Sequence, residues 1–183
     1  FSASTLAAAH VQLNATGTAT GTVTVTGSGN TRTVSLSNLT GSGTLGITLA
    51  AGTATDQAGN TASASAASAS FTVDNSGPTV TISAPSTNFA DGEAVTYSVS
   101  YVDDNFNAST LTSDDISLIR SGTANGSVSV TGSETSYTVR ISGITGTGTL
   151  GIAIAANTAT DKAGNSAPAA TSATAATPAR AAR

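Results

Sequence analysis

Apolar residues alternate with small polar residues along most of the chain, with the period of two that is typical of half-buried β-strands. The clearest case is AVTYSVSYV at Ala94–Val102, where valine or tyrosine occupies every second position. Strands of this kind are predicted at Thr79–Ser83, Ala94–Val102, Asp115–Arg120, Ser127–Thr131, Ser136–Ile144 and Thr149–Ala156, with a last one after Ser166. Seven short strands separated by turn residues predict an all-β, Greek-key β-sandwich.

The chain matches itself without a gap when it is shifted by 105 positions, which sets Phe106 against Phe1. The longest match aligns TVSLSNLTGSGTLGITLAAGTATDQAGN at Thr33–Asn60 with TVRISGITGTGTLGIAIAANTATDKAGN at Thr138–Asn165. Apolar positions keep apolar character while the side chain varies, as in Leu36 against Ile141. The chain is therefore a tandem of two related repeats.

The repeat also predicts the domain boundary. Turn residues fill the segment DNSGP at Asp74–Pro78, which separates two predicted strands. Proline cannot donate to a sheet ladder and suits the start of a new strand. We therefore place the boundary near Ser76, with an incomplete repeat at 1–76 and a second repeat at 77–183.

The first repeat begins at the position equivalent to Phe106, so it lacks the counterparts of the strands at Thr79–Ser83 and Ala94–Val102. We expect this repeat not to be self-sufficient: either it is mobile or aggregates, or a neighbour donates strands to it and the protein assembles into filaments. The second repeat ends in AATPARAAR where a counterpart of Phe71–Asn75 is expected. The tail Ala173–Arg183 is a candidate donor, although its alanine and proline content makes it a poor strand.

Composition favours an ordered protein and excludes several partners. Hydrophobic residues make up 38% and charged residues 9%, whereas disordered chains usually combine high charge with little apolar content. The net charge is −4, and with six basic residues and no basic cluster we expect neither nucleic acid nor an anionic membrane surface as a partner. No apolar run is long enough for membrane insertion. The lack of cysteine excludes disulfides and thiolate chemistry.

Catalysis is not expected. His10 is the only histidine, so a Ser–His–Asp triad would have to use it, and a single histidine without cysteine argues against zinc or copper. We expect His10 to lie on the surface and the chain not to be an enzyme.

The combination of AVTYSVSYV, SDDISL, YTVRISGI, GTLGIAIAANTATDKAGN and FTVDNSGPTVTI resembles the bacterial immunoglobulin-like tandem repeats of large surface adhesins and biofilm-associated proteins. The likeness covers nearly the whole chain except about the last ten residues. It implies an immunoglobulin-like sandwich, an extracellular or cell-surface location, and contacts with neighbouring repeats, other copies of the chain or a surface ligand.

The element A-x-D-x-A-G-N occurs at Ala54–Asn60 and Ala159–Asn165. One interpretation is a turn, since aspartate accepts bonds from backbone amides and glycine takes a positive φ. The other, which the resemblance implies, is calcium bound near the domain junction, because Ca²⁺ takes six to eight oxygen ligands. The candidate metal ligands are Asp74, Asp103, Asp104 and Asp161. Asp103 and Asp104, together with Asp114 and Asp115, are four of only ten acidic residues.

Two functions stay open. The first is a structural or adhesive module of a stalk or filament, in cell adhesion or a biofilm matrix. The second is a binding module whose threonine-rich strands, such as Thr18–Thr26, present hydroxyl groups to glycans or ice. Serine replaces Thr22 and Thr24 in the second repeat, at Ser127 and Ser129, and this drift favours the stalk.

Overall fold

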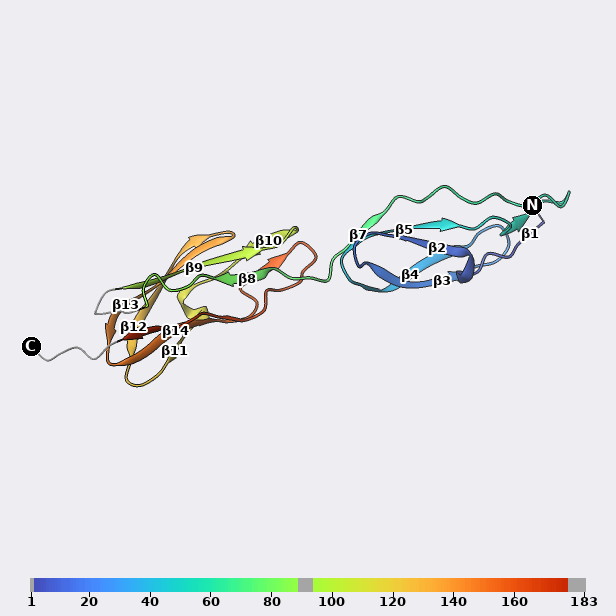
Figure 1. Cartoon of the computed structure of the whole chain (residues 1–183). Coiled ribbons are helices and arrows are strands. Elements are labelled where there is room, and N and C mark those ends of the chain that lie inside the picture. The colour runs from blue at the N-terminus through green and yellow to red at the C-terminus, as the bar shows by residue number, and fades with distance from the viewer. Residues whose placement is uncertain (1, 89–93, 178–183) are drawn as a thin grey trace, which may run out of the picture. The chain divides into compact units, whose positions relative to one another are not determined.

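A computed structural model describes residues 2–88 and 94–177 of the chain (Figure 1). It is all-β, as the alternating pattern predicts, and every strand pair in this part of the chain is antiparallel. Two compact units are present, unit 1 (Phe1–Ser76) and unit 2 (Gly77–Arg183). Each unit is described by itself below.

Helical structure within the described ranges is confined to two 3₁₀ turns, η1 (Ala8–His10) and η2 (Ser113–Asp115). The alanine-rich segments Thr61–Ser70 and Ala167–Ala176 have no helical periodicity and contain no helix. Neither turn has the length and apolar character needed to cross a membrane.

The first sheet of unit 2 has four strands in the order β12-β13-β9-β8. Their bounds are β12 (Asn125–Ser133), β13 (Ser136–Thr145), β9 (Val95–Val102) and β8 (Thr79–Ile82). Every second residue of β9 points into the unit, as the period of two predicts. These inward residues, each at most 2% exposed, are Val95, Tyr97, Val99 and Tyr101.

The second sheet of unit 2 is built around β14 (Gly148–Ile154), which pairs with β11 (Ile116–Arg120) on one side. On its other side β14 pairs with β16 (Ala170–Thr171) and β17 (Ala175–Thr177). The apolar residues of both sheets form one core, so unit 2 is a β-sandwich. Its immunoglobulin-like Greek-key topology stays a prediction.

Unit 2 also contains a separate two-stranded sheet. In it, β10 (Phe106–Ser109) pairs with β15 (Ala159–Asp161). The sequence pattern did not predict either strand, because they are only four and three residues long and carry little alternating apolar character.

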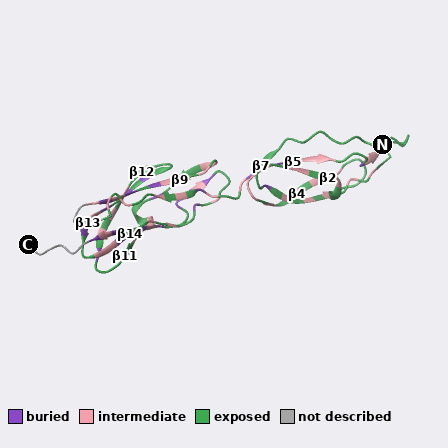
Figure 2. Ribbon diagram, viewed as in Figure 1, coloured by how far each residue is buried: buried purple, intermediate pink, exposed green. Residues whose placement is uncertain are grey.

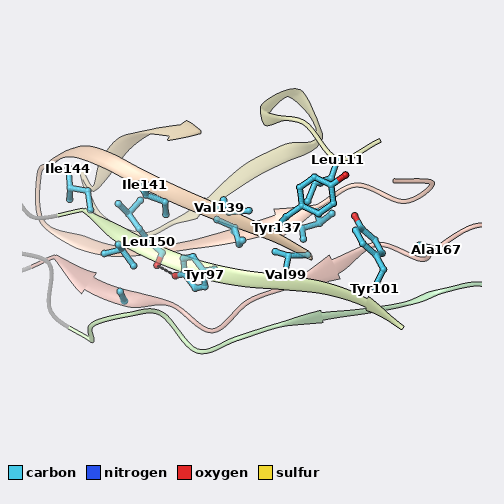
Figure 3. Close-up of a cluster of buried hydrophobic side chains, with 14 of the residues drawn as sticks. Tyr97, Val99, Tyr101, Leu111, Tyr137, Val139, Ile141, Ile144, Leu150 and Ala167 are labelled. Atoms are coloured by element: carbon cyan, nitrogen blue, oxygen red, sulfur yellow. Dashed lines mark hydrogen bonds between the residues drawn. The ribbon is translucent and has the colours of Figure 1, made fainter. Parts of the chain in front are cut away.

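Tyrosines contribute ring packing and hydrogen bonds to the core of unit 2 (Figure 3). The rings of Tyr101 and Tyr137 meet edge to face, with centroids 6.1 Å apart and planes at 87°. The Tyr97 hydroxyl donates to the carbonyl oxygens of Leu150, at 3.3 Å, and Ala173, at 3.2 Å. These bonds satisfy a polar group that would otherwise be costly to bury.

Unit 1 has a smaller set of strands. The first sheet has the order β2-β5-β7, with β2 (Val11–Ala15), β5 (Gly43–Leu49) and β7 (Phe71–Val73). The other pairs are β3 (Thr20–Thr26) with β4 (Thr33–Thr40), and β1 (Ala3–Ser4) with β6 (Ala54–Thr55). Its buried cluster consists of Ala19, Leu45 and Val73, with Leu39 packed against it. Figure 2 accordingly shows far fewer buried positions in unit 1 than in unit 2.

The difference between the units lies in two strands. Sheet β3–β4 of unit 1 corresponds to β12–β13 of unit 2, and no described strand of unit 1 occupies the positions of β9 and β8. In unit 2 these strands supply the four buried side chains of β9, and their counterparts are not among the described core residues of unit 1. At about 1.5–3 kcal/mol for each fully buried side chain, the burial of these four in unit 2 is comparable to the net stability of a domain.

The tail of unit 2 corrects one expectation from the sequence. The run Ala175–Thr177 forms β17, which pairs with β14 as β7 pairs with β5 in unit 1. AAT therefore takes the place of FTV, and this part of the tail is used within its own unit instead of serving as a donor strand. Residues 178–183, the rest of the predicted donor, lie outside the described residues.

Candidate functional site

The D-x-A-G-N element of unit 2 is a turn closed by its own aspartate. The Asn165 backbone N–H donates to Asp161 Oδ1 at 2.8 Å, and the Asn165 side-chain amide donates to Oδ2 at 2.7 Å. The main chain adds a bond from the Gly164 N–H to the Asp161 carbonyl at 3.3 Å. Gly164 has a φ of +91°, which glycine adopts without strain. The turn interpretation of the motif therefore accounts for these residues.

Unit 1 builds the same turn with Asp56. Its Oδ1 accepts the backbone N–H groups of Ala58 and Asn60, each at 2.9 Å, and its Oδ2 accepts the Asn60 amide at 2.8 Å. Hydrogen bonds from the side chain and backbone of Asn60 hold the pKa of Asp56 below its usual range. The two repeats thus share this turn bond for bond.

The two aspartates differ in burial. Asp56 is exposed, whereas Asp161 is 1% exposed. Asp161 belongs to β15, where it pairs with Phe106 of β10, and the next residue, Lys162, donates its N–H to the Asn105 carbonyl at 2.8 Å. Burial by itself would raise the pKa of Asp161, but hydrogen bonds from Asn165, Gly164 and Ala163 outweigh it and lower that pKa.

A second carboxylate lies beside the buried one. Oxygen atoms of Asp103 and Asp161 lie within 4.8 Å of each other. Asp103 is half-buried, and its Oδ1 accepts the Asn105 N–H at 2.7 Å. Asp104 is exposed and is not part of this carboxylate group among the described residues. The structure thus brings together two of the four predicted metal ligands, and hard oxygen donors of this kind suit Ca²⁺.

Asp74, the remaining predicted ligand, belongs to unit 1. It is half-buried, and its Oδ1 accepts the Ser76 N–H at 3.1 Å and the Ser42 hydroxyl at 3.4 Å. Its position in a shared site with the carboxylates of unit 2 stays a prediction.

Asp115, one residue of the other acidic pair of the sequence, has a local structural role. Asp115 ends η2, and its Oδ2 accepts the Thr112 N–H at 2.8 Å and the Thr112 hydroxyl at 2.9 Å. In unit 1 the equivalent residue is His10, whose Nδ1 accepts the Ala7 N–H at 3.1 Å. The repeat aligns His10 with Asp115, but a histidine and an aspartate have no common sequence signal that would predict this shared role.

Known proteins add no assignment to this geometry: no family model, curated protein or solved structure matches the chain.

Proposed function

We propose that the chain is a structural module of an extracellular repeat protein, one that extends a stalk or filament in cell adhesion or a biofilm matrix. The observation that carries the proposal is that several turn-forming contacts recur bond for bond in the two units. The proposal assigns no catalysis to the chain.

Hydroxyl pairs are one such contact. Thr16 and Thr44 join their Oγ1 atoms at 2.8 Å, and the Thr44 N–H donates to Thr16 Oγ1 at 2.9 Å. In unit 2 the pair is Ser121 and Thr149, with both corresponding distances at 2.9 Å. Serine replaces threonine and the bonds are unchanged, so the contact serves the turn and not a particular ligand.

Close backbone packing is another shared contact. Gly43 and Gly148 have φ values of +147° and +146°. A Cβ atom on Gly43 would lie 2.1 Å from the Thr16 carbonyl oxygen, and one on Gly148 would lie 2.0 Å from that of Ser121. Only glycine fits at either position, so both repeats have the same turn geometry here.

The surface chemistry supports an assembly role outside the cell more than a charged partner. Outward positions of the strands carry mainly serine and threonine, and only 9% of all residues are charged. Nucleic acid and anionic membranes need clustered basic groups. The partners proposed here are neighbouring repeats, other copies of the chain and a surface ligand.

A spacer experiment tests the structural role. One, two and four copies of the chain are inserted between a cell-surface anchor and a reporter binder, with a scrambled sequence of equal length as the control. Capture of a partner surface should increase with copy number, while the affinity of the reporter for soluble ligand stays constant. Saturable binding by the chain itself, independent of copy number, would contradict the stalk.

A specific observation favours the second candidate, a hydroxyl-presenting face. Exposed residues of β3 and β4 lie in register, with Thr22 opposite Ser37, Thr24 opposite Ser35 and Thr26 opposite Thr33. Such a face would bind a flat or repetitive surface such as a glycan or ice. Saturable glycan binding or inhibition of ice growth, lost when Thr22 and Thr24 become lysine, would favour this function.

We also propose that unit 2 binds Ca²⁺ through Asp103 and Asp161. Two carboxylates within 4.8 Å repel each other, and a divalent cation would relieve that repulsion. Bound calcium would supply charge neutralisation and stiffen the loops that carry these residues.

A further inference from the structure

A hollow of about 400 Å³ lies on unit 2, between β10 and the turn that joins β12 to β13. Its volume is in the range of small-molecule sites, and its walls combine an aromatic ring with several polar groups. All of its walls belong to unit 2, so it is separate from the β3–β4 face of unit 1. The lining residues are Phe106, Asn107, Ala108, Ser109, Glu134 and Thr135.

Ser109 joins the two walls of the hollow. Its Oγ donates to the Glu134 carbonyl oxygen and therefore accepts the Tyr137 hydroxyl, at 2.7 Å. Tyr137 is 7% exposed and belongs to the core of unit 2. The position of the turn relative to β10 is thus fixed from the core, and a preformed hollow of this kind spares a ligand the cost of ordering the walls.

Glu134 has an unusual backbone conformation. Its φ is +56°, and the other described non-glycine residues with positive φ, Asn38 and Asn157, are asparagines, which tolerate this conformation better. The repeat sets Gly29 against Glu134, and Gly29 adopts its φ of +63° without strain. Unit 2 thus has a carboxylate where unit 1 has the unstrained residue, and strained residues of this kind cluster at binding sites.

Three polar side chains that line the hollow have no hydrogen-bond partner among the described residues. They are the Asn107 amide, the Glu134 carboxylate and the Thr135 hydroxyl, and all three residues are exposed. Phe106 supplies the apolar wall, since it is half-buried and packs against the core of unit 2. The hollow therefore offers a ligand a carboxylate, an amide and a hydroxyl beside a fixed aromatic ring.

We propose that this hollow binds a neutral sugar ring, such as a hexose unit of a glycan. A sugar hydroxyl both donates and accepts, so neighbouring hydroxyls can donate to the Glu134 carboxylate and accept from the Asn107 amide. The C–H groups of the ring are apolar and can pack on Phe106. The proposal goes beyond the stalk function and does not depend on it, and sites of this kind would multiply with the number of units.

Glu134 also determines which ligands are disfavoured. It is the one charged residue among the described residues that line the hollow, so an anionic sugar would meet a like charge. An ammonium group would be attracted to Glu134, but it has donors alone and would leave the Asn107 amide N–H₂ without an acceptor. A neutral sugar uses both groups.

Unit 1 provides an internal comparison. Gly29 removes the carboxylate, and Arg32 replaces Tyr137 and donates to the Ser4 carbonyl at 2.7 Å. Ser4 is the counterpart of Ser109, so unit 1 has a guanidinium where unit 2 has the hydroxyl bridge to its turn. We expect no sugar binding at this place in unit 1.

The test uses the full chain labelled with ¹⁵N and three neutral probes, methyl α-D-mannoside, methyl β-D-galactoside and methyl β-D-glucoside. At least one probe should shift the amide signals of residues 106–109, 134 and 135. The dissociation constant should be about 1–10 mM, as expected for a ligand of about thirteen non-hydrogen atoms. Sodium glucuronate should bind about tenfold more weakly, because of its charge.

Glu134→Gly separates a ligand site from a merely structural turn. The change relieves the positive φ, so the melting temperature of unit 2 should stay the same or rise, while sugar binding should weaken by about tenfold or more. Asn107→Ala should weaken binding by a similar factor. Asp114→Asn is the matched control, since it removes an exposed acidic group on η2 outside the hollow, and binding should be unchanged.

Three results would overturn the proposal. The first is that no glycoside shifts these signals at about 100 mM, or that Glu134→Gly binds as well as the unchanged chain. The second is that methylammonium chloride shifts the same signals at lower concentration than the glycosides, which would make the ligand a cation. The third is that the glycosides shift only signals of β3 and β4, which would assign the sugar to the hydroxyl face of unit 1.

Discussion

The Tyr101 hydroxyl donates a 2.7 Å hydrogen bond to Thr158 Oγ1 inside the core of unit 2. Tyr101 lies on β9, and Thr158 lies in the connection between β14 and β15. The bond therefore links the sheet that contains β9 to this connection. Thr53 is the equivalent threonine of unit 1, and there its Oγ1 donates to the Ala50 carbonyl at 3.4 Å. One half of the contact is thus present in both repeats, and the other half only in unit 2.

Replacement of Tyr101 by phenylalanine should destabilise unit 2 by about 1 kcal/mol, because the Thr158 hydroxyl loses its partner in a buried site. Urea unfolding followed by tyrosine fluorescence reports on unit 2, since the three tyrosines of the chain all lie there. Tyr137→Phe is the matched control. It removes a bond to the half-buried Ser109, which water can replace, and should cost less. Equal losses in the two variants would show that burial of the Tyr101 bond has no special weight.

Acid should weaken unit 2 through Asp161. The pKa of Asp161 is lowered in the folded state, so the stabilisation is full above the ordinary aspartate pKa of about 3.9 and is lost as pH falls through the lowered value. Asp161→Ala should reduce both the stability of unit 2 near neutral pH and its dependence on pH in this range. The exposed Asp56 forms the same turn, and Asp56→Ala should have the smaller effect on unit 1. An unchanged acid transition in Asp161→Ala would contradict the role given to this carboxylate.

Calcium should raise the melting temperature of unit 2 by a few degrees relative to chelator, which is about 1 kcal/mol for a domain of this size. Asp103→Asn should abolish the rise, because it removes one of the two paired carboxylates. Asp114→Asn removes an exposed acidic group on η2 and should leave the rise intact. Identical melting curves with calcium and with chelator would exclude the metal.

His10 and Asp115 should be interchangeable in their turns, since each accepts the N–H three residues earlier. His10→Ala in unit 1 and Asp115→Ala in unit 2 should each cost about 1 kcal/mol, in line with the loss of a capping acceptor. His10→Asp should retain most of the stability of unit 1. Amide signals of each unit, followed through urea unfolding, give the two values separately. A His10→Asp variant as unstable as His10→Ala would show that the equivalence is only geometric.

Strand positions could be predicted from the sequence where one face of the strand is buried and the other is exposed to solvent. The prediction Thr79–Ser83 differs from β8 by one residue, and Ala94–Val102 differs from β9 by one, because alternating valine and tyrosine fix both the strand and its inward face.

Other features depend on partners that local pattern does not reveal. Ala175–Thr177 has weak strand propensity, yet it forms β17 because the edge of β14 offers backbone partners at that place. The burial of Asp161 follows from the pairing of β15 with β10, which joins residues at least fifty positions apart. The sequence named Asp103 and Asp161 as candidates, but only the fold shows that they lie together.

Native-state hydrogen exchange of the full chain tests the central claim most directly, that unit 1 keeps the turns of the repeat but lacks the cover of β8 and β9. Amides of β3 and β4 should exchange about a hundredfold faster or more than those of β12 and β13, because the absent strands remove several kcal/mol of burial. Equal protection of the two sheets in a dilute monomer would contradict the claim, since unit 1 would then be complete without those strands.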